Sequence, residues 1–469
     1  MTFGRCAMLT PCFALLLAAV APRLGPGPHV APRIVVRQAP AAAGDRAVPA
    51  AAAQAEQQAY TLPPDKLAKA IALSRIRNIL DLIGPLWGLV VLWLLLATRA
   101  ASGLEAWTRR VSRHRWVQGL VFFAVFLTIL ALASLPLDAF GHQVSRGYGI
   151  SVQGWGSWLG DQGKSLGLSV LIGAPVLLLF NWIVRRWPRR YWLGAWVVTL
   201  PLLLLSAFLS PLLEPIYNTY EPLAEHHSAL AAKLEAVVAR TGTRIPPERM
   251  FLMKASAKTN GINAYVSGMG ATKRVVVWDT TAGRIPDDEV QFIFGHESGH
   301  YVLRHIPKEL TLSAAGLFFV YWACAGIAAW LARRFGASWR LGGREDVRAS
   351  GTGSIAESVL ASRAGFVVLL SVLSTAGFVL APIDNTVSRC FEHEADVYGQ
   401  EAIHGVVADP RKTAVAAFNA LGEAWLDDPN PSPFIEFWEY DHPSTQTRAN
   451  FALHYDPWAN GGHGEFFTK

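Results

Sequence analysis

The amino-acid sequence predicts a mainly α-helical protein that crosses a membrane several times and carries a small α+β region. Of its 469 residues, 52% are apolar and only 16% are charged, whereas soluble domains carry roughly 25% charged residues. The uncharged residues gather in long stretches, and one water-soluble core could not bury that much apolar surface. An ordinary soluble enzyme is therefore excluded.

The first 59 residues precede the long apolar stretches. Residues 1–21 contain Arg5, an apolar run and a small-residue ending, which is typical of a cleaved signal peptide or of a retained signal anchor. Residues 22–59 are rich in Ala and Pro and contain few large apolar side chains. Because such a segment cannot bury enough surface to offset the entropy of ordering, we expect a disordered linker.

Six apolar stretches follow, and each is close to the about 20 residues that an α-helix needs to cross a bilayer. They lie at about residues 79–98, 117–137, 165–184, 191–213, 310–332 and 364–384. The alternative is a set of buried core helices, but so many stretches of this length do not fit inside one soluble domain. We therefore predict six membrane spans in contact with lipid.

Arginines mark the loops after the first, third and fifth stretches. They are Arg99, Arg109, Arg110, Arg113 and Arg115, then Arg185, Arg186, Arg189 and Arg190, then Arg333, Arg334, Arg340, Arg344 and Arg348. Basic loops stay on the cytoplasmic side, so residues 214–309 and the C-terminal tail are expected on the extracytoplasmic side. The net charge is +7, and the basic residues cluster beside the apolar stretches. This arrangement favours anionic lipid and disfavours nucleic acid as a partner.

The polar region at 214–309 predicts a small α+β unit. Residues 228–240 have the periodicity of an amphipathic helix, and residues 249–252 and 275–278 are typical of short strands. Between the two strands, residues 263–270 alternate weakly and end in glycines. This pattern predicts an edge strand followed by a turn.

A helical pattern at 292–303, preceded by three acidic residues at 287–289, contains His296, Glu297 and His300 in the spacing His-Glu-x-x-His. Residues four apart share a helix face, so both imidazoles can bind one tetrahedral zinc ion, and Glu297 can reach the open coordination position. Zinc lowers the pKa of a bound water towards ~7, and a neighbouring carboxylate can move that water's proton to a leaving amine. The motif therefore predicts hydrolysis of amide bonds.

A second acidic segment supplies a candidate third ligand. Glu392 and Asp396 are four residues apart and share a helix face. Glu392 can complete a His-His-Glu site, and Asp396 can accept the second ring N–H of a ligating histidine. His393 and Glu394 point away from that face and are expected at the surface. We expect His305 to cap the end of the zinc-motif helix.

Near the C-terminus, residues 441–448 lack a long apolar run, which favours a loop that re-enters the site. His442 is a candidate donor to the oxyanion of a tetrahedral intermediate, which can contribute about 3 kcal/mol. Arg448 is a weaker candidate that could bind a carboxylate or a backbone carbonyl.

With these motifs, the sequence resembles the type I CAAX prenyl protease family, the a-factor-converting zinc endopeptidases of the gluzincin group, over about residues 60–455. The N-terminal part of the resemblance rests on Gly147-Tyr-Gly-Ile-Ser151, on Trp158-x-x-Asp161 and on Pro211-x-x-x-Pro215-Ile-Tyr-Asn218. The sequence departs from the family in four respects. The family usually has seven spans, whereas this sequence has six and an N-terminal apolar segment, and the Ala/Pro-rich linker has no counterpart in the family. Ser298 stands where a leucine is common, and eukaryotic members place the metal site on the cytosolic side, whereas the arginine-rich loops here favour the other side.

The resemblance implies a role for each matching residue. It implies one zinc ion per chain held by His296, His300 and Glu392, with Glu297 as the catalytic acid and base. It also implies that Asp396, Asn385 and Arg389 support the ligands and that His442 acts in catalysis. Peptide substrate is expected to lie as an added strand against Asn263, Ala264 and Tyr265.

The resemblance further implies a ring of membrane helices around a water-filled chamber with the zinc facing inwards. The implied division is residues 60–215 for the N-terminal membrane domain, 216–455 for the zinc peptidase domain with two more spans, and 456–469 for a C-terminal tail. Family members cleave beside a prenylated cysteine in a CAAX tail, and relatives process other membrane peptides. We expect a monomer that cleaves peptides at the membrane.

Two other classes of function fit the sequence less well. A transporter would carry charged residues inside its spans, but only Asp81 and Asp384 qualify, and both lie at span ends. A non-proteolytic zinc-binding scaffold would be expected to lack Glu297 or a ligand, and neither is missing. The sequence therefore favours a protease.

Overall fold

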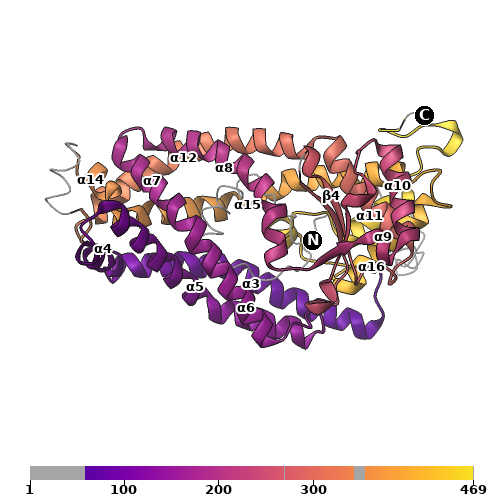
Figure 1. Ribbon diagram of the computed structural model, residues 1–469, viewed down its shortest axis with the longest axis horizontal. Helices are drawn as coiled ribbons and strands as arrows, with labels where there is room; N and C mark the ends of the chain where they lie inside the picture. The colour runs from indigo at the N-terminus through magenta and orange to yellow at the C-terminus, as the bar shows by residue number, and fades with distance from the viewer. Residues whose placement is uncertain (1–58, 269, 343–353, 468–469) are drawn as a thin grey trace, which may run out of the picture.

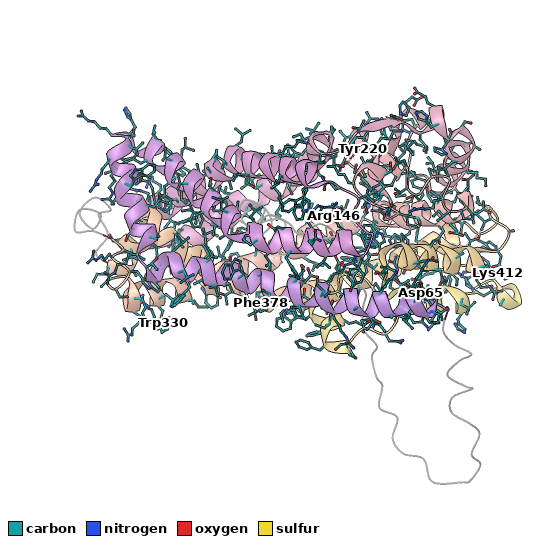
Figure 2. All side chains as sticks on the ribbon, turned by 90° about the horizontal axis from the view of Figure 1, so that it is seen from below. Asp65, Arg146, Tyr220, Trp330, Phe378 and Lys412 are labelled. Carbon is teal, nitrogen blue, oxygen red and sulfur yellow. The ribbon has the colours of Figure 1, made fainter. Side chains whose placement is uncertain are left out.

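The computed structural model describes residues 59–268, 270–342 and 354–467. The predicted signal sequence at 1–21, and the predicted linker except for residue 59, lie outside the described residues. Long helices run between the two ends of an elongated molecule, and a small sheet lies at one of these ends (Figure 1). Asp65 and Lys412 lie at the end that carries the sheet, and Trp330 lies at the opposite end (Figure 2).

Among the described residues, five helical segments are long and apolar enough to cross a membrane, and a sixth is a pair of helices bent by 47°. The five are α3 (Pro64–Ala97), α5 (Arg115–Gly147), α6 with α7 (Trp155–Leu168 and Ala174–Arg186), α12 (His305–Phe335) and α15 (Arg363–Ala402), and the bent pair begins within α8 (Tyr191–Leu213). Each of the six predicted stretches falls on one of these segments. The prediction of a multi-pass, mainly helical membrane protein is confirmed.

Several helices extend well beyond the apolar stretches that predicted them. Helix α3 begins at Pro64 instead of residue 79, and α15 continues to Ala402 instead of residue 384. The apolar pattern marks only the part of a helix that lies in hydrocarbon, whereas the hydrogen-bonded helix continues into polar residues. As a result, α15 is one rigid element that joins a membrane span to the polar segment containing Glu392.

The apolar surface of the spans suits a lipid environment. Buried side chains such as Phe122, Phe126 and Leu177 form a cluster between the membrane helices. Other large apolar side chains point outwards, and Leu171 is 71% exposed and Phe319 65% exposed. Such exposure is unfavourable in water but costs nothing against acyl chains.

The sheet has four strands in the order β1-β2-β4-β3. The strands are β1 (Tyr220–Pro222), β2 (Met250–Met253), β3 (Ala264–Ser267) and β4 (Arg274–Trp278). Strand β2 pairs parallel to β4, and β1 and β3 pair antiparallel to their neighbours. Strand β3 lies at an edge, as predicted. Strand β1 was not predicted, because three residues ending in Pro222 carry no recognisable alternation.

Helices cover the sheet and form a second apolar core with it. They are α9 (Leu223–His226), α10 (Ser228–Thr241), α11 (Asp287–Val302), α16 (Pro410–Trp425) and α18 (Thr445–His454). Helix α17 (Pro433–Glu439) packs instead against α15 and α3. Helix α10 matches the predicted amphipathic helix closely, and Leu234 and Val237 on its apolar face are fully buried. The predicted loop at 441–448 ends early, because the Ser444 side chain accepts a hydrogen bond from Thr447 N–H and caps α18.

The N-terminal motifs join the membrane helices to the sheet region. Ser151 forms a β-bridge with Thr259, and Val152 N–H donates to the Lys258 carbonyl at 3.0 Å. The Lys258 ammonium in turn lies 2.6 Å from the Asp161 carboxylate. These contacts fix the loop that leads into β3 against the start of α6.

The described parts of the three arginine-rich loops meet at the end of the molecule that lies away from the sheet, whereas Arg344 and Arg348 lie outside the described residues. Helix α4 (Ala100–Val111), the end of α7 and α14 (Ile355–Ala361) lie together there (Figure 1). The Arg99 side chain donates to the Ser338 carbonyl at 3.1 Å, and Arg189 lies 3.6 Å from Glu357.

Candidate metal centre

Helix α11 presents the His-Glu-x-x-His motif to the neighbouring helix α15. Glycines allow the two backbones to approach closely. A Cβ at Gly399 would lie 2.7 Å from the His296 backbone nitrogen, and one at Gly295 would lie 3.1 Å from the Gly399 carbonyl oxygen. This close approach lets short side chains from both helices reach one point.

His296, His300 and Glu392 converge at that point. The Nε2 atoms of the two histidines are 3.2 Å apart. The Glu392 carboxylate lies 3.3 Å from His296 Nε2 and 3.5 Å from His300 Nε2. All three donor atoms fall within 4.8 Å of one another, as ligands of one metal ion must.

The chemistry of the donors fits a metal cation. Glu392 Oε2 is buried, and although the Nε2 atoms of His296 and His442 lie within 3.3 Å of it, it accepts no well-aligned hydrogen bond from the described residues. Burial lowers the pKa of His300 to about 3, which keeps its imidazole neutral and free to bind a metal. Burial also disfavours a charged His296, but the Asp396 and Glu392 carboxylates outweigh it and raise the pKa of His296 to about 9. The site therefore attracts positive charge.

Asp396 lies behind His296, and Arg448 holds it there. Asp396 Oδ1 is 2.8 Å from His296 Nδ1. The Arg448 guanidinium binds both oxygens of Asp396, at 2.6 and 2.8 Å. All three residues are at most 6% exposed. The sequence predicted that Arg448 could bind a carboxylate or a backbone carbonyl. In the structure, the carboxylate that it binds is that of Asp396, which is itself part of the site.

Glu297 and His442 flank the donor set. The Glu297 carboxylate accepts a hydrogen bond from the backbone N–H of Val266, and burial raises its pKa. His442 Nε2 lies 3.2 Å from Glu392, and its Nδ1 lies 2.8 Å from Asp441. Burial works against a charged His442, yet the Glu392 and Asp441 carboxylates raise its pKa.

Asn385 and Arg389 form hydrogen bonds with backbone carbonyls, and their expected role in supporting the ligands stays a prediction. Both lie on α15 before Glu392, and their side chains bind backbone carbonyls of α17 and the residue after it. Asn385 donates to Trp438 at 2.7 Å, and Arg389 donates to Tyr440 at 2.6 Å. They therefore anchor the chain that leads to His442.

Asn263, Ala264 and Tyr265, the residues expected to bind the substrate strand, lie at or just before β3 and differ in how their backbone groups are used. Both backbone groups of Asn263 are occupied, because its N–H donates to Thr281 and its carbonyl accepts from Trp278. Tyr265 pairs with Val276 of β4, and its hydroxyl donates to buried Glu214 at 3.0 Å. Because strand residues alternate, the backbone groups of Ala264 and Val266 point to the free edge of β3, where the Val266 N–H already donates to Glu297.

One residue near the site differs from the sequence-based expectation. His305 is not a helix cap: it is 1% exposed and lies against His300, with their Nδ1 atoms 3.1 Å apart. Glu394 is partly exposed, as expected of a surface residue, and it also binds His305. The signal in the sequence was the position of His305 five residues after His300, directly beyond the end of the motif helix.

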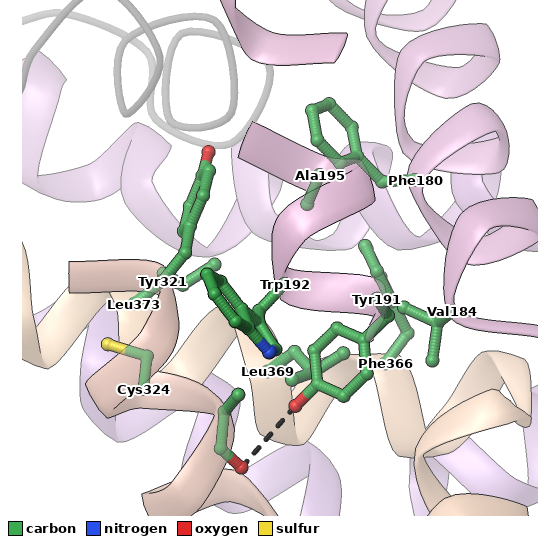
Figure 3. Close-up of a pocket in the computed structure, with 11 residues that line it drawn as sticks. Phe180, Val184, Tyr191, Trp192, Ala195, Tyr321, Cys324, Phe366, Leu369 and Leu373 are labelled. Atoms are coloured by element: carbon green, nitrogen blue, oxygen red, sulfur yellow. Dashed lines mark hydrogen bonds between the residues drawn. The ribbon is translucent and has the colours of Figure 1, made fainter. Parts of the chain in front are cut away.

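An apolar pocket lies elsewhere, between membrane helices α7, α8, α12 and α15. Its walls include Phe180, Trp192, Tyr321 and Phe366, and the Tyr191 hydroxyl on its rim donates to the Ala325 carbonyl at 3.4 Å (Figure 3). No charged side chain lines it. None of the candidate metal ligands and none of the candidate catalytic residues lines it, so the pocket is separate from the metal centre.

Two family models match consecutive parts of the chain. The model described as "CAAX prenyl protease N-terminal, five membrane helices" matches residues 45–219, and that of peptidase family M48 matches residues 225–456. The fold resembles the crystal structure of Ste24p from S. mikatae, with a TM-score of 0.69 and 21% identity over 84% of this chain and 89% of that one.

Curated relatives agree with these matches. An uncharacterized metalloprotease of Bacillus subtilis, YhfN, is 32% identical over 416 residues, which cover 87% of this chain and 91% of the relative. CAAX prenyl protease 1 of Saccharomyces cerevisiae is 25% identical over 340 residues, or 71% of each chain. The chain therefore belongs to peptidase family M48 and is an integral-membrane metalloendopeptidase.

Proposed function

We propose that the protein is a zinc endopeptidase that binds one zinc ion per chain and hydrolyses membrane-associated peptides. The convergence of His296, His300 and Glu392 from two packed helices carries this proposal. Two imidazoles and one carboxylate leave the fourth position of a tetrahedral zinc ion open, which is the arrangement of catalytic rather than structural zinc sites. The division into residues 60–215 and 216–455, and the monomeric state, remain predictions.

The bound zinc ion would supply an acidified water and polarise the scissile carbonyl. Glu297 accepts a proton from the attacking water and delivers it to the leaving amine, and its raised pKa suits both directions of transfer. His442 carries its proton towards the donor set and can donate to the oxygen of the tetrahedral intermediate. Asp441 orients the His442 ring, and Asn385 and Arg389 fix the backbone before it.

Removing the metal is expected to abolish proteolysis reversibly. Purified protein should contain one zinc per chain by elemental analysis, and a chelator should remove both the metal and the cleavage of a reporter peptide. Added zinc should restore both. Full activity in the metal-free protein would contradict the proposed mechanism, whereas zinc binding without cleavage of any peptide would favour a zinc-binding scaffold.

We propose that the peptide substrate pairs with the open edge of β3. The Val266 N–H donates to Glu297, so a strand that pairs with the Ala264 backbone and the Val266 carbonyl would lie directly beside the donor set. Backbone pairing places the scissile bond without selecting particular side chains, which suits a protease of broad specificity. Several relatives are named CAAX prenyl protease 1, so a prenylated CAAX-type peptide is one substrate to test.

Substrate pairing with β3 predicts an alternating effect of backbone N-methylation in the peptide. A methyl group on an N–H that faces β3 removes one hydrogen bond of about 1 kcal/mol, so KM should rise about 5- to 10-fold. N-methylation of the neighbouring residues should change KM little, because their N–H groups point away. A scan of singly methylated peptides checks this, and an effect without period two would contradict strand pairing.

We also propose that the metal centre faces the extracytoplasmic side. The described parts of the three arginine-rich loops converge at the end of the molecule away from the sheet, and basic loops remain in the cytoplasm. The end that carries α11 then lies across the membrane from them.

Cysteine labelling in intact cells tests this orientation. Ser228 on α10 and Ser338 in a basic loop are both exposed, at opposite ends. In a Cys390→Ser background, which removes an exposed thiol, Ser228→Cys should react with an impermeant maleimide in intact cells. Ser338→Cys should react only after permeabilisation, and the reverse pattern would place the metal centre in the cytoplasm.

A further inference from the structure

A short hydrogen-bonded chain runs away from the metal-binding point behind His300. His305 Nδ1 lies 3.1 Å from His300 Nδ1, and His305 Nε2 lies 3.0 Å from the Glu394 carboxylate. Lys308 lies 3.3 Å from the same carboxylate. The turn between α11 and α12 produces this contact, because Arg304 adopts a left-handed conformation with φ of 58° and brings His305 back against His300.

The chemistry of the three groups sets the direction of each hydrogen bond. His300 offers Nε2 to the metal-binding point, so its single proton is on Nδ1 and is donated to His305. His305 then accepts at Nδ1 and carries its own proton on Nε2, where the Glu394 carboxylate accepts it. Each ring therefore has only one tautomer that satisfies all of its partners.

The two ligand histidines thus have different supports. His296 is backed by Asp396, a carboxylate that is paired with Arg448. His300 is backed by His305, and the negative charge lies one residue further away, on Glu394. The ring of His305 is itself held by stacking on Phe391, with ring centroids 4.7 Å apart.

We propose that His305 and Glu394 are positioning residues that hold the His300 ring in the metal-binding orientation and tautomer. This inference rests on the proposed zinc site. Partners of this kind orient a ligating imidazole and raise its basicity, and their loss typically weakens metal binding 10- to 100-fold.

Zinc affinity of the full-length protein, measured by chelator competition, tests the proposal. His305→Phe keeps an aromatic ring to stack on Phe391 but removes both nitrogens, and it should weaken zinc binding about 10- to 100-fold. His305→Gln retains an acceptor for His300 and a donor for Glu394, and it should recover most of that loss. His404→Phe is the control, because His404 also stacks on an aromatic ring, Trp458, without touching a ligand.

Further measurements separate this inference from the function on which it rests. Glu394→Ala changes a partly exposed side chain, so it tests the hydrogen-bonded chain from His300 to Glu394 even if His305→Phe does not fold. Like His305→Phe, it should weaken zinc binding. The visible spectrum of the cobalt-loaded protein should change in His305→Phe and return towards wild type in His305→Gln. Unchanged zinc affinity in His305→Phe and Glu394→Ala would overturn the inference, whereas wild-type protein that binds no zinc would overturn the proposed function.

Discussion

Glu297→Gln is expected to abolish proteolysis while leaving the metal bound. Glutamine has nearly the same size and keeps an oxygen that can accept from the Val266 N–H, so the local structure should persist. It cannot take a proton from the attacking water, and losing a general acid and base costs roughly 10²- to 10⁴-fold in rate. The ligands His296, His300 and Glu392 are untouched, so the zinc content should match that of the wild type.

Cleavage of a reporter peptide by mass spectrometry, together with elemental analysis, checks this prediction. Glu289→Gln is a matched control, because Glu289 lies in the first turn of the same helix and outside the donor set. Using each peptide with and without an isoprenyl group would also reveal whether prenylation matters. In cells, comparing the termini of membrane-associated peptides between wild type and Glu297→Gln would identify substrates. Undiminished activity of Glu297→Gln would refute the assigned role.

The local parts of the site could be predicted from the sequence, because helix geometry alone determines them. His296 and His300 share a face of α11, and Glu392 and Asp396 share a face of α15. Two imidazoles on one face and a carboxylate on the other make up a His-His-Glu ligand set, which predicts that the two faces meet at one metal ion. The close approach that brings them together depends on Gly399, whose role is visible only when its neighbour α11 is in place.

Other parts depend on chain reversals and distant contacts that leave no local pattern. The position of His305 follows from one left-handed residue, Arg304, and such a turn without glycine has no clear signal in the sequence. Asn385 and Arg389 lie on the ligand helix, yet they bind backbone carbonyls near α17. A carbonyl acceptor is present at every residue, so the sequence could not identify which ones they bind.

The buried pair of Asp396 and Arg448 also escaped prediction as a pair, and breaking it should have the second large effect. Asp396→Ala is expected to destabilise the fold by about 3–5 kcal/mol, because it leaves a buried guanidinium without its carboxylate. It should also weaken metal binding about 10- to 100-fold, because His296 loses the acceptor for its Nδ1–H. Measuring unfolding in the presence of a chelator separates the two effects.

The double variant Asp396→Ala/Arg448→Ala tests whether the lost stability comes from the unpaired charge. Removing both partners leaves no uncompensated charge, so its stability should exceed the value that the two single variants predict additively. Glu423→Ala is the control: Glu423 pairs with Lys66, both side chains are about half exposed, and its loss should cost less than about 1 kcal/mol. Additive losses in the double variant would mean that Asp396 and Arg448 stabilise the fold through separate contacts, and the rigid support behind His296 would then rest on Asp396 alone.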